Sequence, residues 1–229
     1  LMRLKGKNIL VSGGNGRLGR ELIPLLKREG AVVMAPARAE WDVALYPCGL
    51  AMPSKPDIII HAAAYTDVAK AENEKHDCQY LNVEATRRVS KLAYELKAKM
   101  VYVSSDYVDV EPMGFYAFTK KAGEAFISKR TGLIIRTSFK PRDTWGKDKL
   151  RGVFHPVYTN ADWTDVIALK IVDAICEDKK GIVRIGTERK TLKELALQEY
   201  PDVIEIPVEV ADTKLGYIYP RDTTLVLPI

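Results

Sequence analysis

The chain has 229 residues, a formal net charge of +5 and 47% hydrophobic residues, so it can bury a sizeable core in one domain, with or without a small appended lobe. Its basic residues are scattered and form no stripe, which argues against a nucleic-acid partner. No apolar run approaches the length of a membrane-spanning helix, and the three separated cysteines lack metal-ligand spacing. We therefore expect a soluble, cytoplasmic protein with reduced thiols, no membrane contact and no metal.

The first part of the chain predicts a strand, a glycine turn, a helix and a second strand. The apolar run at 8–12 leads into the turn at 13–19, and the spacing of apolar residues indicates a helix over 17–28. Gly30 ends this helix, and residues 31–35 have the composition of a strand. These elements make one complete βαβ unit.

Later strands and helices alternate in the same way. Strands are expected at 57–61, 100–104, 132–136 and 181–185, and helices at about 77–96, 115–130 and 162–177. This alternation predicts an α/β fold, a Rossmann-type doubly wound parallel sheet with helices on both faces. A capping box at Thr191 starts one more helix.

Beyond residue 136 the pattern loosens. Residues 138–158 are expected to form loops over the ligand edge of the sheet, and the tail at 201–229 is expected to be irregular. We therefore predict an NAD(P)-binding Rossmann core at 1–137 and an abbreviated C-terminal substrate lobe at 138–229. Segments at about 157–186 are expected to return from the lobe to the core.

Three glycines in the turn after the first strand carry a binding signal. Gly13 can turn the chain where a side chain would clash, and Gly16 leaves the backbone bare for a pyrophosphate at the helix N-terminus. Gly19 lets the helix pack closely on the sheet. The spacing Gly-x-x-Gly-x-x-Gly is one residue longer in its first half than the usual dehydrogenase fingerprint. Alone, the loop leaves two interpretations open, a dinucleotide site and a plain turn.

A tyrosine and a lysine at helical spacing are candidates for proton chemistry. Tyr116 and Lys120 lie one turn apart on the helix expected at 115–130. A lysine ammonium at that distance favours the phenolate, which predicts a tyrosine usable as a general acid at neutral pH. Ser105 follows the preceding strand and should reach the same carboxyl edge, where its hydroxyl could hold a carbonyl oxygen. Alone, such a pair also occurs by chance in many helices.

Together these features resemble the extended short-chain dehydrogenase/reductase family: the glycine loop, Ala62, Ala63, Ala64, Ser105, Tyr116 and Lys120. The segments at 57–68 and 104–108, with Asn82 between them, are similar to the dTDP-4-dehydrorhamnose reductase family and its NAD-dependent sugar epimerase relatives. The likeness is strong from about residue 8 to residue 137 and faint afterwards.

The resemblance implies a role for each of four residues. Tyr116 would protonate a ketone oxygen while hydride arrives from a nicotinamide, and Ser105 would position the carbonyl. Lys120 would bind the nicotinamide ribose and tune Tyr116, and Asn82 would support the active-site backbone and water. The residues that the resemblance implies for cofactor binding are Gly13, Asn15, Gly16, Arg17, Leu18, Gly19, Arg38, Asp42, Val43, Ala62, Ala63, Ala64, Tyr65, Tyr116 and Lys120.

The choice of cofactor depends on the end of the second strand. NAD enzymes place a carboxylate there for the ribose 2′-hydroxyl, whereas an arginine accommodates a 2′-phosphate. This chain has Arg38 and no acidic residue before Glu40, and Arg17 in the glycine loop can reach the same phosphate. We expect NADP to be preferred over NAD. The alternative is that Arg38 is only a solvated loop residue.

Several positions depart from the family pattern. His61 stands where asparagine is usual, and we expect a packed histidine and no metal ligand. The link from Asp106 to Tyr116 is short, and Phe139 replaces a tryptophan that stacks on the substrate. The cofactor half is therefore intact and the substrate half is reduced.

The resemblance implies an NADP-preferring reductase that acts on the keto group of a nucleotide-activated sugar. Two alternatives stay open: a nucleotide-sugar epimerase or dehydratase of the same family, and a regulatory subunit that binds NADP without turnover. Because members of the family commonly dimerise through helices of this sheet, a homodimer is also expected.

Overall fold

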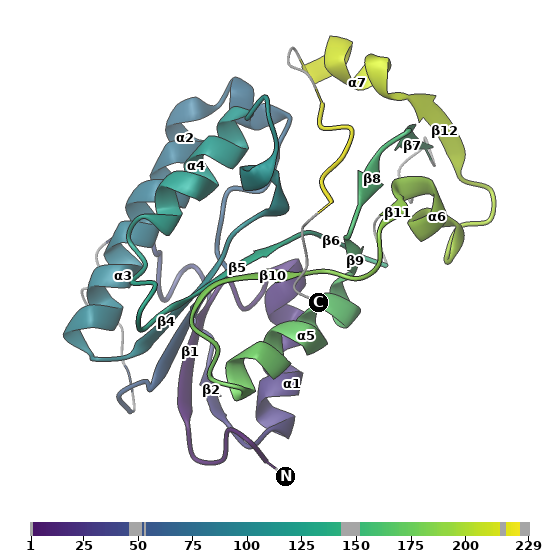
Figure 1. Cartoon of the computed structure of the whole chain (residues 1–229). Helices are drawn as coiled ribbons and strands as arrows, with labels where there is room; N and C mark the ends of the chain where they lie inside the picture. Colours follow the sequence, from purple (N-terminus) through teal and green to yellow (C-terminus); the bar gives the residue numbers. More distant parts are fainter. Residues whose placement is uncertain (1, 46–51, 53, 143–151, 216–218, 225–229) are drawn as a thin grey trace.

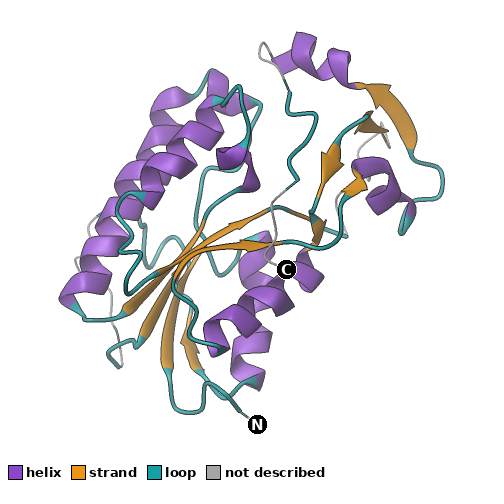
Figure 2. Ribbon diagram, in the orientation of Figure 1, coloured by secondary structure: helices purple, strands orange, loops and turns teal. Residues whose placement is uncertain are grey.

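A parallel sheet of six strands forms the centre of the computed structural model, in which the described residues are 2–45, 52, 54–142, 152–215 and 219–224. The strands are β1 (Asn8–Ser12), β2 (Val32–Met34), β3 (Ile58–His61), β4 (Lys99–Val103), β5 (Leu133–Thr137) and β10 (Gly181–Ile185). Their order in space is β10-β5-β4-β3-β1-β2, and every neighbouring pair is parallel. The sheet, orange in Figure 2, confirms the doubly wound Rossmann-type fold.

Helices cover both faces of the sheet (Figure 1). One face carries α1 (Arg17–Arg28) and α5 (Thr164–Cys176). The other carries α2 (Lys75–Gln79), the π-helical turn η2 (Tyr80–Glu84), α3 (Ala85–Glu95) and α4 (Phe115–Glu124). Strand residues alternate between the two layers, so Ile9 and Val11 pack toward α1 and α5 while Leu10 packs toward α3. No helix within the described ranges is long and apolar enough to cross a membrane.

The boundaries expected for the helices and strands of the core agree with the structure to within two residues, with two exceptions. The helix expected at 77–96 is a continuous segment of α2, η2 and α3, whose middle turn is π-helical. The helix expected at 115–130 ends at Glu124, because the chain continues in tighter turns: the Phe126 amide donates to the Gly123 carbonyl and the Ile127 amide to the Glu124 carbonyl.

The order of the strands positions a ligand site at one edge of the sheet. From β1 the chain moves to β2 on one side and then crosses to β3 on the other side of β1. In an open α/β sheet, such a reversal leaves a crevice at the carboxyl ends of the two central strands. Ser12 ends β1 and pairs with His61 at the end of β3, so the crevice opens beyond these two residues.

The C-terminal part builds a small lobe from three pairs of short strands. β6 (Phe139–Lys140) pairs with β9 (Asp162–Trp163), β8 (Tyr158–Thr159) with β11 (Lys190–Thr191), and β7 (Gly152–His155) with β12 (Ile204–Pro207). The helices there are α6 (Leu192–Leu197) and α7 (Val208–Leu215); two short turns elsewhere are η1 (Lys70–Glu72) and η3 (Asp106–Asp109). The expected capping box is present, with Thr191 and Glu194 bonded reciprocally at the start of α6.

The expectation of loops at 138–158 is wrong where β6 and β7 lie, and that of an irregular tail after residue 201 is wrong because β12 and α7 lie there. β12 is formed by pairing with β7, about fifty residues earlier in the chain, and most of its side chains are exposed. A strand that depends on a distant partner and buries little leaves no apolar periodicity in the sequence. The division after residue 137 stays a prediction.

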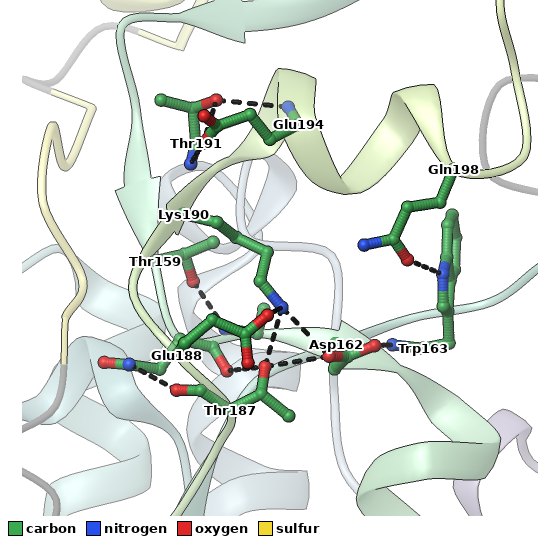
Figure 3. Close-up of polar contacts among 11 residues, drawn as sticks. Thr159, Asp162, Trp163, Thr187, Glu188, Lys190, Thr191, Glu194 and Gln198 are labelled. Carbon is green, nitrogen blue, oxygen red and sulfur yellow. Dashed lines mark hydrogen bonds and ion pairs between the residues drawn. The ribbon is translucent and has the colours of Figure 1, made fainter.

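A buried ion pair ties the lobe together (Figure 3). Lys190 Nζ, in a side chain that is only 7% exposed, lies 3.0 Å from Asp162 Oδ2 and donates to Thr187 Oγ1 at 2.8 Å. Asp162 also accepts from the Trp163 amide at 2.7 Å, and Trp163 Nε1 donates to Gln198 of the segment after α6. The network joins β9 to a later stretch of the chain that includes Thr187 after β10, β11 and Gln198 after α6.

Lys190→Met should lower the free energy of unfolding by about 3 kcal/mol, because it leaves the Asp162 carboxylate buried without its cation. Chemical denaturation monitored by circular dichroism measures the change. The matched control is Lys193→Met, which removes an ion pair with Glu205 between more exposed side chains and should cost less than about 1 kcal/mol. Equal losses in the two variants would contradict a structural role for the buried pair.

Candidate functional site

A cavity of about 840 Å³ lies at the carboxyl ends of β1, β3, β4 and β5. Most of the residues expected from the sequence line it together: Gly13, Asn15, Gly16, Arg17, Leu18, Gly19, Arg38, Asp42, Val43, Ala62, Ala63, Ala64, Ser105, Tyr116 and Lys120. Asn82 and Tyr65 are the two expected residues that do not line it. The fold thus gathers segments from more than a hundred residues of chain around one hollow.

The glycine loop forms a bare backbone cradle at one side of this cavity. Gly13 has a positive φ of 73°, and a Cβ there would lie 2.7 Å from the Ala63 amide nitrogen. A Cβ on Gly19 would clash with the Gly13 carbonyl oxygen, so α1 can approach the loop only without a side chain. Gly16 caps α1 with no side-chain hydrogen bond. The first amides of α1 are therefore open to an anionic group, as a pyrophosphate requires.

An arginine and an aspartate of the cavity wall form an ion pair that the sequence did not indicate. Arg38 Nε lies 3.3 Å from Asp42 Oδ2, and the Arg38 side chain is 79% exposed. Asp42 Oδ1 also accepts from the Ala44 amide at 2.9 Å. An exposed pair of this kind contributes little stability, so Arg38 can exchange its partner for a stronger anion at small cost.

Tyr116 and Lys120 project from the first two turns of α4 toward the cavity. Lys120 is 2% exposed, and its Nζ lies 4.4 Å from the centroid of the Tyr102 ring. Burial lowers the pKa of Lys120 to about 7, although the nearby Glu124 carboxylate opposes this. Burial raises the pKa of Tyr116 above its ordinary value, and the Asp106 charge adds to the increase.

The pKa of Tyr116 therefore differs from the sequence expectation, in which the Lys120 ammonium favours the phenolate. Burial disfavours the charged form of both groups, so the lysine loses its proton more readily while the tyrosine keeps its own. Tyr116 is consequently a protonated phenol throughout the neutral pH range, which is the state required of a proton donor.

Ser105 and Asp106 form a buried polar pair beside Tyr116. Ser105 Oγ donates to Asp106 Oδ1 at 3.2 Å and accepts from the Tyr107 amide at 3.2 Å, which caps η3. Asp106 is 2% exposed, and burial raises the pKa of its carboxyl to about 6, against opposing contributions from Thr223 and Lys140. Asp106 is not among the site residues expected from the sequence; its position directly after Ser105 was the available signal.

Asn82 lies outside the cavity wall and links two segments that border it. Its Oδ1 accepts from the Tyr65 amide at 2.9 Å, and its Nδ2 donates to Thr119 Oγ1 at 3.0 Å. Tyr65 belongs to the segment after β3, whereas Thr119 lies on α4 between Tyr116 and Lys120. Asn82 itself sits in the π-helical turn η2, where a wider turn alters the direction of side chains. It therefore joins the cofactor side of the cavity to the helix that carries Tyr116 and Lys120.

An ion-pair network supports α4 from behind. Ser104 Oγ donates to Glu124 Oε1 at 2.6 Å, and Arg136 binds Glu124 Oε2 at 2.7 Å. Arg136 also pairs with Asp109 of η3, which accepts a second ion pair from Arg184 at 3.1 Å. β5, α4, η3 and β10 are fixed to one another by this network, so Tyr116 and Lys120 rest on a rigid support.

His61 is a packed histidine whose two ring nitrogens both have hydroxyl partners. Its Nδ1 lies 2.6 Å from Ser12 Oγ and its Nε2 lies 3.2 Å from Thr86 Oγ1. Burial lowers the pKa of His61 to about 3, so its ring is neutral. Among the residues that the structure describes, no three His, Cys, Asp or Glu side chains are arranged to hold a metal ion.

Further residues of the cavity wall were not assigned to the site from the sequence. They are Ser12, Gly14, Pro36, Trp41, Thr66, Val68, Leu81, Val103, Ser104, Tyr107, Thr137, Ser138, Phe139, Lys140 and Pro141. Phe139 was noted only as a departure from the family. Most of these residues lie at or after the ends of strands, and the parallel topology brings them to the carboxyl edge of the sheet. No local sequence motif identifies them.

The parallel sheet, the glycine cradle at its crossover and the Ser105, Tyr116 and Lys120 group define a Rossmann-type protein of the extended short-chain dehydrogenase/reductase class. More narrowly, residues 7–140 match the family described as RmlD substrate binding domain, and the chain belongs to this family.

Relatives and solved structures agree with this assignment. The chain is 33% identical over 151 residues to a dTDP-4-dehydrorhamnose reductase of Streptomyces griseus, covering 57% of this chain and 49% of the relative. It is 32% identical over 152 residues to the reductase of Escherichia coli strain K12, covering 58% of this chain and 51% of the relative. The chain thus spans about half the length of the curated relatives it matches.

In solved structures the similarity extends over nearly the whole fold. A dTDP-4-dehydrorhamnose reductase from Bacillus anthracis in complex with NADP superposes with a TM-score of 0.83 and 22% identity, covering 97% of this chain and 91% of that one. A hypothetical dTDP-4-dehydrorhamnose reductase from Sulfolobus tokodaii gives a TM-score of 0.78 and 28% identity, covering 95% and 91%. The first of these shows the shared fold alone.

Asp106→Asn should stabilise the protein at pH 8 by up to about 3 kcal/mol, because the native state then no longer buries a carboxylate. In the wild type, the folded pKa of about 6 lies above the unfolded one, so the folded state binds more protons between about pH 4 and 6 and the Asp106 contribution is lost as pH rises through that window. Chemical denaturation of the wild type and of Asp106→Asn from pH 4 to 8 measures the difference in their free energies of unfolding.

The control for this prediction is Asp109→Asn, which removes a partner of Arg136 and Arg184 and should destabilise the protein at pH 8. A constant stability difference between wild type and Asp106→Asn from pH 4 to 8 would contradict a buried, titrating Asp106.

Proposed function

We propose that this protein is an NAD(P)-dependent oxidoreductase that reduces the keto group of a nucleotide-activated sugar. The observation that carries the proposal is the arrangement of one cavity: Ser105, Tyr116 and Lys120 share its wall with a glycine cradle and an uncapped helix N-terminus. A dinucleotide needs the cradle, and a carbonyl reduction needs the three side chains. The names of the curated relatives support a dTDP-4-dehydrorhamnose reductase-like substrate.

The residues of the chain divide the chemistry among them. When bound, the reduced nicotinamide supplies a hydride to the carbonyl carbon. Tyr116 donates its phenolic proton to the carbonyl oxygen, and Ser105 positions that oxygen with its hydroxyl. Lys120 holds the nicotinamide ribose. The product is an alcohol, and the Tyr116 phenolate that remains regains a proton before the next turnover.

The cofactor is proposed to be NADP in preference to NAD. Arg38 and Arg17 both line the cavity, and Arg17 is exposed at the start of α1. The two guanidinium groups of Arg17 and Arg38 suit a ribose that carries a 2′-phosphate better than one with a bare 2′-hydroxyl. Structures of similar fold contain NADP in the Bacillus anthracis protein and NAD⁺ in the Bordetella bronchiseptica enzyme WbmH, so the fold itself accepts either dinucleotide.

The substrate is proposed to lie against residues that follow the ends of β3, β4 and β5. Thr66, Val68, Tyr107, Phe139 and Lys140 line this part of the cavity. The aromatic rings offer flat apolar surfaces, and the Lys140 cation suits the diphosphate of a nucleotide sugar. The homodimer expected from the family stays a prediction.

Tyr116→Phe should lower turnover by about 10²- to 10⁴-fold, because it removes the proton donor and keeps the ring. The assay mixes the purified protein with NADPH and a panel of nucleotide 4-keto sugars and follows the loss of NADPH absorbance. Tyr94→Phe, at a tyrosine that is 86% exposed, is the matched control and should keep full turnover.

The same assay separates the alternative functions. Turnover without added NADPH, with NAD retained through purification, would favour an epimerase or dehydratase. Binding of NADPH with no turnover of any sugar would favour a regulatory subunit and would sink the reductase proposal.

Arg38→Ala should weaken NADPH binding about tenfold and NADH binding less than twofold, because one charge-assisted contact to the 2′-phosphate is lost. Fluorescence titration with the two dinucleotides measures both affinities. Arg20→Ala, at an exposed arginine of α1 outside the cavity wall, serves as the control. Equal weakening of NADPH and NADH by Arg38→Ala would remove the basis for an NADP preference.

A further inference from the structure

Asp106 is a buried titratable group with no step of its own in the proposed reduction. Its side chain belongs to a residue that is 2% exposed and does not line the cavity. Its Oδ1 nevertheless lies 3.2 Å from the hydroxyl of Ser105, and Ser105 does line the cavity. Asp106 therefore reaches the cavity wall through Ser105, and its protonation state acts first on that hydroxyl.

Three polar groups surround the hydroxyl of Ser105. The Tyr107 amide donates to its oxygen at 3.2 Å, Asp106 Oδ1 lies 3.2 Å away, and the Tyr116 phenol is hydrogen-bonded to it. A serine hydroxyl has one hydrogen to donate and two lone pairs that accept. Because the Tyr107 amide takes one lone pair, the second lone pair and the single hydrogen are shared between Asp106 and a group on the cavity side.

The protonation state of Asp106 decides where the Ser105 hydrogen points. A carboxylate has no hydrogen and can only accept, so an ionised Asp106 takes the hydrogen of Ser105. The hydroxyl then presents a lone pair to the cavity, which cannot hydrogen-bond a carbonyl oxygen. A protonated Asp106 donates to the second lone pair of Ser105 instead, and the Ser105 hydrogen is free to turn toward the cavity.

We propose that Asp106 is a positioning residue that has to hold a proton for Ser105 to donate its hydrogen to the substrate carbonyl, an inference that rests on the proposed reductase function. The carbonyl oxygen then accepts from both Ser105 and Tyr116. Tyr116 still supplies the proton of the product alcohol and the dinucleotide its hydride, so the Asp106 proton is held and not consumed. One preorganised donor to a developing oxyanion contributes about 10²- to 10³-fold to a rate.

The polar and charged groups that face Asp106 or its turn η3 come from several elements. They are Tyr107 of η3, Tyr116 of α4, Arg136 of β5, Lys140 of β6 and Thr223 of the C-terminal segment. Arg136 pairs with Asp109, at the other end of the turn. Burial favours the acid form of Asp106, whereas a hydrogen bond from Thr223 and the Lys140 charge favour the carboxylate. The balance raises the pKa of Asp106 to about 6.

The test is the pH dependence of kcat/KM, measured with NADPH and the nucleotide 4-keto sugar that the protein reduces fastest. In the wild type, kcat/KM should fall about tenfold per pH unit above the Asp106 pKa of about 6. In Asp106→Asn, the side-chain amide donates to Ser105 at every pH, so this decrease should disappear. At pH 8 the variant should exceed the wild type about tenfold or more, a gain that damage to the structure does not produce.

Two further variants test whether the effect passes through Ser105. Ser105→Ala should lower kcat/KM below pH 6 by about 10²-fold, and adding Asp106→Asn to it should change the pH dependence no further. Thr223→Val removes a donor that favours the Asp106 carboxylate, so the pH midpoint of the decrease should move upward.

The matched control is Asp109→Asn, at the other aspartate of η3. The Asp109 carboxylate pairs with Arg136 and Arg184. Its removal should therefore leave the pH midpoint of the decrease where it is in the wild type, even where the absolute rate changes.

Three outcomes would overturn the inference and leave the proposed function standing. The same decrease in the wild type and in Asp106→Asn would assign the titration to another group, such as Lys120 with its pKa of about 7. Lower activity of Asp106→Asn at every pH would give Asp106 a different role. An unchanged midpoint in Thr223→Val would separate the decrease from Asp106. A wild type that reduces no keto sugar at any pH would instead overturn the proposed function, and the inference with it.

Discussion

The close approach of two backbone segments, Gly13 after β1 and Ala63 after β3, is the constraint on which the candidate site depends. β1 and β3 are registered neighbours up to Ser12 and His61, and a Cβ on Gly13 would lie 2.7 Å from the Ala63 amide nitrogen. Because both segments are nearly bare, the crevice stays open beyond the strands and the first amides of α1 face it. A dinucleotide phosphate can then be met by backbone dipoles, with no side chain in the way.

Burial controls the charge states of the titratable side chains around Tyr116. The pKa values of Lys120 and His61 are lowered and those of Asp106 and Tyr116 are raised, and in each case burial is the largest cause. All four groups are thus moved toward their neutral forms, as expected where few counter-charges and little water are present. A site of this kind keeps a phenol protonated and strengthens each hydrogen bond to a carbonyl oxygen.

Polar clamps give the site its rigidity. Asn82 connects the segment after β3 to α4 through Tyr65 and Thr119, and Arg136 connects β5 to α4 and η3. In the lobe, Lys190 and Asp162 have the same function between β9 and β11. These interactions join elements that are separated in the sequence, so the cavity wall depends on the complete fold.

Much of the core and of the candidate site could be predicted from local patterns. The alternation of apolar strands and amphipathic helices predicted the parallel sheet, and the Gly13, Gly16 and Gly19 spacing predicted the turn at the end of β1. These features depend on neighbours within one or two turns of chain, which sequence periodicity records. The Tyr116 and Lys120 spacing similarly placed both side chains on one face of α4.

Only the tertiary structure decided the rest. β12 needs β7 as its partner, and Asn82 acts on α4 through Thr119, so neither could be found in a local window. The direction of the Tyr116 pKa shift depends on desolvation by the surrounding fold and on the buried Asp106 carboxyl nearby, neither of which the four-residue spacing records. By itself, then, the sequence determined which residues can meet at the carboxyl edge, and long-range packing determined their partners and their charge, because burial and counter-charges come from residues far apart in the chain.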